Sequence, residues 1–231
     1  MNLKLKIMSK IIVIGDTHGH NTWKEVVEKE TFDKVVFLGD YVDSFGVKPE
    51  EIIKNLQDIV EYKEKMGDKC ILLYGNHEHS YVNYERCSGY NIYYAKLYDA
   101  ILDRLYKERL IDIIYIHNDI IMSHAGVSQE WLTKVAQLDK VEDIHFNNLS
   151  LDALNFNLFS GYNSYGDTIS QSPIWIRPSS LLKSKVEGYR QIVGHTPIKS
   201  PQDIDGIYFN DLMPNYYIVI EDNNITYKSL K

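Results

Sequence analysis

Three short apolar runs near the amino terminus alternate with two helical stretches, and this alternation constrains the fold more than any other feature of the chain. The apolar runs cover residues 11–15, 34–39 and 70–74, and their length is typical of buried strands. The stretches between them, 23–30 and 49–65, place apolar residues at helical spacing. Strand, helix, strand, helix, strand is the order expected of an open α/β sheet.

The rest of the chain adds further strands to this pattern. We expect a helix at 93–110, then a hairpin that joins 111–116 to 120–124. Residues 128–172 are weakly patterned, and we expect helices and loops there that cover one face. The last four expected strands are 190–195, 207–210, 216–220 and 225–229. Because 231 residues suffice for one sizeable core and no linker or internal repeat interrupts them, we predict a single domain over residues 1–231.

The composition argues against several classes of function. The formal net charge of -7 at pH 7 disfavours a nonspecific grip on nucleic acid or on an anionic membrane. Two cysteines, Cys70 and Cys87, are too few for a disulfide framework, which fits a reducing compartment. The amino-terminal residues alternate apolar and charged types, unlike a secretory signal, and no apolar run is long enough to span a bilayer. We therefore predict a cytoplasmic protein.

Polar residues follow five of the expected strands at the point where each strand ends. The carboxyl ends of the strands in an open α/β sheet border one crevice, so these side chains should converge. They are Asp16, His18, Asp40, Asp43, Asn76, His77, His124 and His195. Carboxylates, imidazoles and an amide together suit divalent ions such as Mn, Fe or Zn, and the set is large enough for two ions. One such motif alone would also fit a polar loop, but five of them in order favour a metal site.

The motifs that these residues form resemble those of the calcineurin-like metallophosphoesterases, and within that family the phosphoprotein-phosphatase branch that includes bacterial and bacteriophage enzymes. They are GDTHG at 15–19, GDYVD at 39–43, GNHE at 75–78, SHAG at 123–126 and GHTP at 194–197. The resemblance implies a central two-sheet β-sandwich flanked by helices. We accordingly expect an α/β (α+β) fold with a dinuclear metal site at the strand ends.

The resemblance also implies which residues hold the metal ions. One ion would be held by Asp16, His18 and Asp40, and the other by Asp40, Asn76, His124 and His195, with Asp40 bridging the two. We expect two divalent ions, with manganese first and iron or zinc as alternatives that the same ligands would accept.

The catalytic roles can be argued from physical chemistry beside the resemblance. Two ions about 3.5–4 Å apart clamp a phosphoryl group, neutralise its growing charge and convert a bridging water into hydroxide near neutral pH. The leaving alkoxide still needs a proton, which an imidazole outside the metal set can supply. We predict that His77 is this general acid, and that Asp43 fixes its tautomer and favours its protonated form.

Two positions depart from the family pattern in a way that bears on the substrate. Protein phosphatases of this branch hold phosphate oxygens with arginines where this chain has Ser44 and Tyr74. A third family arginine, which follows a tryptophan, matches Arg177. We predict that Arg177 and Asn76 bind the phosphorylated substrate, since a guanidinium fork matches phosphate oxygens well.

Three hypotheses about function remain open. The first is a phosphatase that hydrolyses phosphate monoesters, with a serine/threonine protein phosphatase as one form of it. The second is the same site acting on a nucleotide such as a dinucleoside polyphosphate, or on a phosphodiester. Pro197 disfavours the diester, because many phosphodiesterases of the superfamily have a second histidine at that position. Tyr41, Tyr74 and Tyr81 would stack a nucleobase or hold an aryl phosphate if they line the site.

The third hypothesis is a catalytically silent module that binds phosphate and keeps the fold. Loss of His77 or Asp40 would be the signature of such a module, and both residues are in place.

Overall fold

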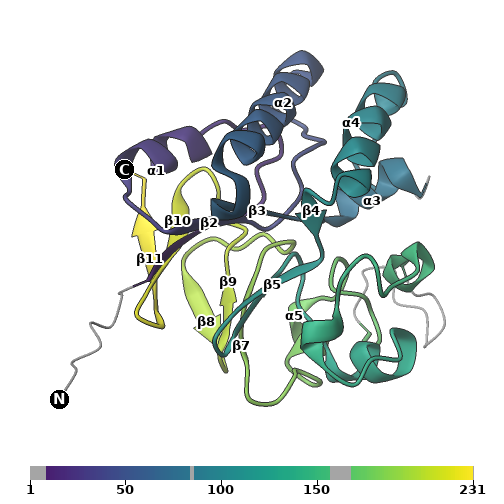
Figure 1. Ribbon diagram of the computed structural model, residues 1–231, viewed down its shortest axis with the longest axis vertical. Coiled ribbons are helices and arrows are strands. Elements are labelled where there is room, and N and C mark those ends of the chain that lie inside the picture. Colours follow the sequence, from purple (N-terminus) through teal and green to yellow (C-terminus); the bar gives the residue numbers. More distant parts are fainter. Residues whose placement is uncertain (1–8, 84–85, 157–167, 231) are drawn as a thin grey trace.

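Two mixed sheets form the centre of the protein, and helices flank them (Figure 1). The computed structural model describes residues 9–83, 86–156 and 168–230. The first sheet has the order β11-β10-β1-β2-β3-β4 and is built from β1 (Lys10–Ile14), β2 (Lys34–Phe37), β3 (Cys70–Leu73), β4 (Ile111–Asp112), β10 (Tyr216–Glu221) and β11 (Asn224–Ser229). The second has the order β5-β6-β7-β9-β8 and is built from β5 (Ile114–His117), β6 (Ile120–Ser123), β7 (Arg190–Val193), β8 (Gln202–Ile204) and β9 (Ile207–Phe209).

Each sheet contains a set of parallel strands. In the first sheet β1, β2 and β3 run parallel, with Ile12 beside Val35. In the second sheet β6, β7 and β9 run parallel. Side chains that follow parallel strands leave a sheet at the same edge, so each sheet delivers three strand ends to one place.

Strand β1 illustrates how the two sheets pack against each other and against the helices. Ile11 and Val13 belong to a buried cluster with Met122 of β6, which places them between the sheets. Ile12 and Ile14 belong to a second buried cluster, which also contains Trp23 of α1 (Trp23–Lys29) and Leu56 of α2 (Pro49–Met66). Side chains alternate across a strand, so the apolar run at residues 11–14 of β1 contributes to both cores. Burying each aliphatic side chain contributes roughly 1.5–3 kcal/mol.

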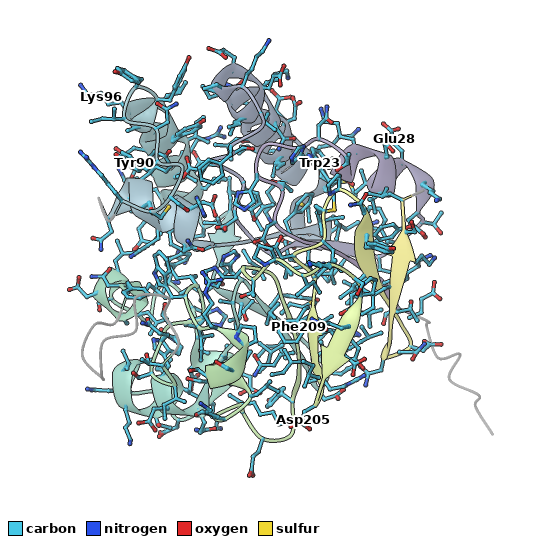
Figure 2. The ribbon with its side chains drawn as sticks, turned by 180° about the vertical axis from the view of Figure 1, so that it is seen from behind. Trp23, Glu28, Tyr90, Lys96, Asp205 and Phe209 are labelled. Carbon is cyan, nitrogen blue, oxygen red and sulfur yellow. The ribbon has the colours of Figure 1, made fainter. Side chains whose placement is uncertain are left out.

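The helices cover the outer faces of the sheets (Figure 1). They are α1 (Trp23–Lys29), α2 (Pro49–Met66), α3 (Asn76–Val82), α4 (Ala95–Lys107) and α5 (Pro178–Leu181), with helical turns at Gly67–Lys69, Trp131–Val135, Val141–Asp143 and Leu151–Leu154. Helix α2 buries Ile52, Leu56 and Ile59, which recur at helical spacing. Trp23 of α1 lies beside it, and its Nε1 donates to Asn55 Oδ1 at 2.8 Å (Figure 2). Among the described residues, every helix is too short or too polar to cross a membrane.

The predicted α/β (α+β) fold, a central two-sheet β-sandwich flanked by helices, is confirmed. Of the region 128–172, the described residues form helical turns and loops, while 157–167 lie outside the described part of the chain. The prediction of a single domain over residues 1–231 also includes undescribed residues and stays a prediction.

The predicted strand at 111–116 is wrong in one respect, because it is two strands in two sheets. Ile111–Asp112 pairs with β3 in the first sheet, and Ile114–His117 pairs with β6 in the second. Ile113 between them is fully buried, and its N–H bonds to Asp112 Oδ1 at 2.8 Å instead of to a strand. An unbroken apolar run conceals this switch, because periodicity does not encode the partner of a strand. The sequence interpretation also missed β8 and helix α3.

Glu30, at the end of α1, ties three strands together. Its carboxylate accepts hydrogen bonds from Lys10 Nζ at 2.6 Å, Tyr217 Oη at 2.8 Å and Lys228 Nζ at 3.0 Å. Burial acts to raise the pKa of Glu30, but these donors outweigh it and lower the pKa from 4.5 to about 2. A depressed carboxyl pKa contributes stability that is complete above the unfolded value and lost as pH falls through the folded one.

We therefore expect Glu30→Gln to lower the free energy of unfolding by about 1–2 kcal/mol at pH 7. The deficit should shrink as pH falls from about 5 to about 2, because the wild-type carboxylate is then protonated as well. Urea denaturation over a pH series measures this difference in the free energy of unfolding between the variant and the wild type. Glu28→Gln is the matched control, since Glu28 is exposed on the same helix (Figure 2). A deficit that stays constant down to pH 2 would contradict this role for Glu30.

Candidate active site

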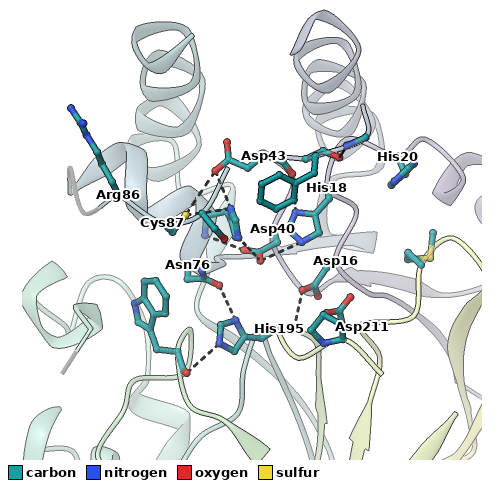
Figure 3. Close-up of a pocket in the computed structure, with 18 of the residues that line it drawn as sticks. Asp16, His18, His20, Asp40, Asp43, Asn76, Arg86, Cys87, His195 and Asp211 are labelled. Carbon is teal, nitrogen blue, oxygen red and sulfur yellow. Dashed lines mark hydrogen bonds and ion pairs between the residues drawn. The ribbon is translucent and has the colours of Figure 1, made fainter. Parts of the chain in front are cut away.

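A cavity of about 950 Å³ opens where the parallel strands of both sheets end (Figure 3). It is lined by eight of the nine predicted site residues: Asp16, His18, Asp40, Asp43, Asn76, His77, Arg177 and His195. The ninth, His124, is fully buried behind Asn76 and His195. The residues predicted from five separate strand ends therefore converge in one place.

The backbone at four of these residues is unusual. His18, Asp40, Asp43 and His195 have φ values of 43°, 50°, 60° and 63°. Left-handed conformations are uncommon outside glycine, although aspartate, asparagine and histidine adopt them most readily. Each residue lies in the loop that follows its strand and lines the cavity. Such conformations cost free energy and occur often at functional sites.

Two glycines allow the segments of the site to approach closely. A Cβ added at Gly75 would lie 2.2 Å from Asp40 Oδ1, and one at Gly194 would lie 2.0 Å from Asp16 Oδ1. The carboxylates occupy the space that any larger residue would fill. This packing explains why glycine precedes Asn76 and His195 in the sequence.

Asp40 lies at the centre of the site. Its Oδ2 is 3.4 Å from His124 Nε2, 3.8 Å from His18 Nε2 and 3.8 Å from His77 Nε2. Burial acts to raise the pKa of Asp40, but His124 and the other imidazoles outweigh it and hold the pKa well below its usual range. Asp40 is therefore a carboxylate that remains ionised within a ring of imidazoles.

Three of the histidines turn one ring nitrogen toward Asp40 or Asn76 in the interior of the site. Each has its other ring nitrogen near a backbone carbonyl, which can only accept a hydrogen bond. These contacts are His18 Nδ1 to Asp43 O at 2.9 Å, His124 Nδ1 to Leu38 O at 3.0 Å and His195 Nε2 to Trp175 O at 3.2 Å. Each carbonyl accepts a hydrogen bond from one ring nitrogen, which leaves the other nitrogen facing the interior. Metal-binding histidines are held in this way.

Asn76 completes a compact group of donors with two of these histidines. Its Oδ1 lies 2.9 Å from both His124 Nε2 and His195 Nδ1, and those two nitrogens are 3.2 Å apart. Burial and the neighbouring His124 hold the pKa of His195 well below its usual range, so its ring is neutral. An amide oxygen and two neutral imidazoles around one small space are suited to a divalent ion.

Asp16 has a free carboxylate oxygen deep in the site. Its Oδ2 accepts the backbone N–H of His195 at 2.9 Å, while Oδ1 is buried without a hydrogen-bond partner. Burial, with Asp211 and Asp40 nearby, raises the pKa of Asp16 well above its usual range. An unpartnered buried carboxylate oxygen is costly unless a cation or a proton satisfies it. The donor set therefore fits a metal centre.

His77 lies between Asp43 and Asp40, and its contacts with them fix its ring. Its Nδ1 lies 2.9 Å from Asp43 Oδ2, and the Tyr81 hydroxyl donates to the other oxygen of Asp43. Burial acts to lower the pKa of His77, but Asp40 and the hydrogen bond with Asp43 outweigh it and raise the pKa to about 12. The raised pKa makes His77 an imidazolium.

Glu78 has a structural role in positioning the site. Its fully buried carboxylate accepts the backbone N–H of Asp40 at 2.8 Å, Tyr41 at 2.8 Å and Gly75 at 3.0 Å. These bonds fasten the loop after β2 to the start of α3. The sequence predicted a metal ligand at Asn76, a proton donor at His77 and a supporting role for Glu78, but it did not identify the backbone groups that Glu78 anchors.

Two residues that line the cavity were missed from the sequence. Asp211 lies two residues after the end of β9, so the rule that found the other strand-end residues should have included it. Burial raises the pKa of Asp211, and the nearby Asp40 adds to the effect. Arg86 lies in the loop after α3, with its guanidinium 5.6 Å from the Tyr90 ring centre. No local pattern marks a loop arginine of this kind.

The departures from the family pattern have structural explanations. Ser44 Oγ accepts the N–H groups of Gly46 at 3.2 Å and Val47 at 3.3 Å, so it stabilises a turn at the cavity mouth. Tyr74 is buried, and its ring packs on Phe146. The suggestion that Tyr41, Tyr74 and Tyr81 stack on a substrate is wrong, because none of them lines the cavity and all three are buried.

The family model described as calcineurin-like phosphoesterase matches residues 9–226. The chain belongs to the calcineurin-like phosphoesterase family. Membership confirms the resemblance seen in the motifs and makes the protein a hydrolase of phosphate esters, with candidate metal ligands in the His and Asp clusters around Asp40.

Solved structures show the same fold at low sequence identity. A cold-active protein-tyrosine phosphatase of the psychrophile Shewanella sp. is 16% identical, with a TM-score of 0.61 over 96% of this chain and 80% of that one. A protein serine/threonine phosphatase from Saccharomyces cerevisiae is 15% identical, with a TM-score of 0.59 over 96% of this chain and 79% of that one. No curated protein sequence matches this calcineurin-like phosphoesterase.

Proposed function

We propose that this calcineurin-like phosphoesterase hydrolyses phosphate monoesters with the help of two divalent metal ions. The observation that carries the proposal is the buried carboxylate of Asp40, which faces nitrogens of three imidazoles. Two of them, His18 and His124, donate to a backbone carbonyl through Nδ1 and turn Nε2 toward that carboxylate. This arrangement is typical of metal ligands.

The metal ligands are assigned from the donor atoms. We assign one ion to Asp16, His18 and Asp40, and the other to Asp40, Asn76, His124 and His195. When bound, the ions would neutralise charge on the phosphoryl group and activate the attacking water. Manganese is our choice because the donors are oxygen and nitrogen, and iron or zinc would satisfy the same set. A cytoplasmic location is part of the same proposal.

We assign His77 to proton donation. A protonated imidazole has no lone pair at either nitrogen, and the raised pKa of His77 keeps it in that form. Its Nε2 faces the side of the cavity where Asp40 lies, and would give its proton to the leaving oxygen. Asp43 holds Nδ1, and Tyr81 holds Asp43, so the ring keeps one orientation.

The substrate class follows from the size and lining of the cavity. A volume of about 950 Å³ accepts a small ester or a phosphorylated side chain of a protein. The two structural neighbours are described as protein-tyrosine and protein serine/threonine phosphatases, which favours including phosphoproteins. Pro197 lines the cavity, and its side chain cannot bind a metal or donate a proton as a histidine would, so we place phosphodiesters second.

We expect Arg177→Ala to raise KM for a phosphate monoester by about 10- to 100-fold, with a smaller change in kcat. Arg177 lines the cavity, and its Nη1 donates to the carbonyl of His195 at 3.0 Å, which places a guanidinium beside the proposed metal ligands. A hydrogen bond to a charged group contributes about 1.5–3 kcal/mol. Arg104→Ala, an exposed arginine of α4, is the matched control. An unchanged KM would show that Arg177 does not bind the substrate.

The function itself is tested by substrate choice. Metal-stripped protein reloaded with Mn²⁺ is given p-nitrophenyl phosphate, bis(p-nitrophenyl) phosphate and a dinucleoside polyphosphate in parallel. The proposal expects the monoester to be hydrolysed fastest. Preference for the diester or the anhydride would overturn the substrate class and leave the metal chemistry standing. Absence of turnover with all three would point to the silent phosphate-binding module.

A further inference from the structure

A third group of potential ligand atoms lies behind His77, and the proposed reaction uses only part of it. Cys87 Sγ is 3.3 Å from His77 Nδ1 and 3.9 Å from Asp43 Oδ2, and those two atoms are 2.9 Å apart (Figure 3). All three residues line the cavity, so the group can be reached from solvent. Cys87 has no role in the proposed reaction.

The three separations match those of a tetrahedral zinc site. Zinc binds thiolate sulfur at about 2.3 Å and imidazole nitrogen or carboxylate oxygen at about 2.0–2.2 Å, which sets the ligand atoms about 3.3–3.6 Å apart. The sulfur–nitrogen separation of 3.3 Å lies at the edge of that range, and the other two, 3.9 Å and 2.9 Å, lie outside it by a few tenths of an ångström. Small side-chain shifts would therefore admit an ion between the three atoms, with the cavity open to a fourth ligand.

The donors also differ in kind from those around Asp40. The proposed catalytic ligands provide only oxygen and nitrogen, whereas this group adds a sulfur, which favours zinc over manganese. Tyr81 donates to Asp43 Oδ1, so Oδ2 is the oxygen turned toward His77 and Cys87. His77 can take part through Nδ1 while its Nε2 still faces the proposed catalytic centre.

We propose that Asp43, His77 and Cys87 form a zinc site, distinct from the catalytic metal centre, through which zinc inhibits the enzyme. Zinc takes the lone pair of His77 Nδ1 and the thiolate of Cys87, and both atoms release their protons to solvent. The ion replaces the hydrogen bond between His77 Nδ1 and Asp43 and shifts the ring, which disturbs proton delivery from Nε2 to the leaving oxygen. The inhibition rests on the proposed function, whereas zinc binding by these three residues does not.

Cobalt is the probe for the site itself, because a thiolate bound to Co²⁺ produces a charge-transfer absorption band that oxygen and nitrogen ligands do not. We expect the full-length, Mn²⁺-loaded protein to develop this band with Co²⁺ and to lose it when Zn²⁺ is added. The band should be absent in Cys87→Ser. It should persist in Cys70→Ala, because Cys70 is fully buried in β3 and burial raises the pKa of its thiol to about 12.

Two further measurements complete the test. Zn²⁺ should slow alkylation of Cys87 in the folded wild-type protein. This measurement requires no substituted variant. The Zn²⁺ concentration for half-inhibition should be at least about 10-fold higher in Cys87→Ser than in the wild type. Inhibition of each protein is measured relative to its own rate without zinc. A missing cobalt band, a band that survives in Cys87→Ser, or alkylation that zinc does not slow would overturn the site. If the band behaves as expected but no phosphatase activity is found, the zinc site stands and the proposed function fails.

Discussion

Replacing His77 with asparagine is expected to lower kcat for an alkyl phosphate by about 10²- to 10⁴-fold, the usual contribution of a positioned general acid. His77 is held by Asp43 with its Nε2 toward the proposed metal centre, and its raised pKa makes it an imidazolium. The loss should be much smaller for p-nitrophenyl phosphate, because p-nitrophenolate leaves without needing a proton. Steady-state rates on both substrates measure the difference.

The control for this variant is His20→Asn. His20 is an exposed histidine that lines the same cavity and has no assigned role. The His20→Asn substitution should leave the rates on both substrates close to those of the wild type. If His77→Asn lost the same factor on both substrates, His77 would be acting as a metal ligand or a structural residue, and the assignment of the general acid would be wrong.

Asp40→Asn is expected to have the largest effect on metal binding. Asp40 is the carboxylate proposed to bridge both ions, and three imidazole nitrogens lie within 3.8 Å of its Oδ2. Loss of a residue that only supports a ligand costs about 10- to 100-fold in affinity or activity, so loss of the bridging ligand should cost more. We expect the variant to retain at most one ion per chain and to lose more than about 100-fold in kcat.

Metal analysis after gel filtration and the rate with p-nitrophenyl phosphate measure the two effects. Asp58→Asn is the control, because Asp58 is an aspartate of α2 that pairs with Lys24 and Lys54 away from the cavity. An Asp40→Asn protein that keeps both ions and a tenth or more of its activity would show that Asp40 does not bridge.

The convergence of the site could be predicted because short-range patterns encode it. Asp16, Asp40 and Asn76 each follow a strand that the apolar runs identify, and parallel strands deliver their ends to one edge. The sandwich needed the family resemblance, because the strand pattern by itself indicates an open sheet. Periodicity says which residues face a core and does not say which strand lies beside which.

The remaining features depend on contacts between residues far apart in the chain. Glu78 binds backbone groups 36 to 38 positions earlier, so nothing near it in the sequence marks the contact. Cys87 and Asp43 are separated by 44 positions, and their proximity arises only when the loop after α3 folds back onto the cavity. Asp211 was accessible to sequence reasoning and was overlooked, since it follows an expected strand as the other acidic residues do.

The most direct test of the proposed function is a titration of metal-stripped protein with Mn²⁺ while p-nitrophenyl phosphate hydrolysis is followed. We predict no turnover above background without metal, and a rate that rises until two ions are bound per chain. The same rate before and after metal is added, or no turnover with Mn²⁺, Fe²⁺ or Zn²⁺, would contradict a two-metal phosphatase built around Asp40.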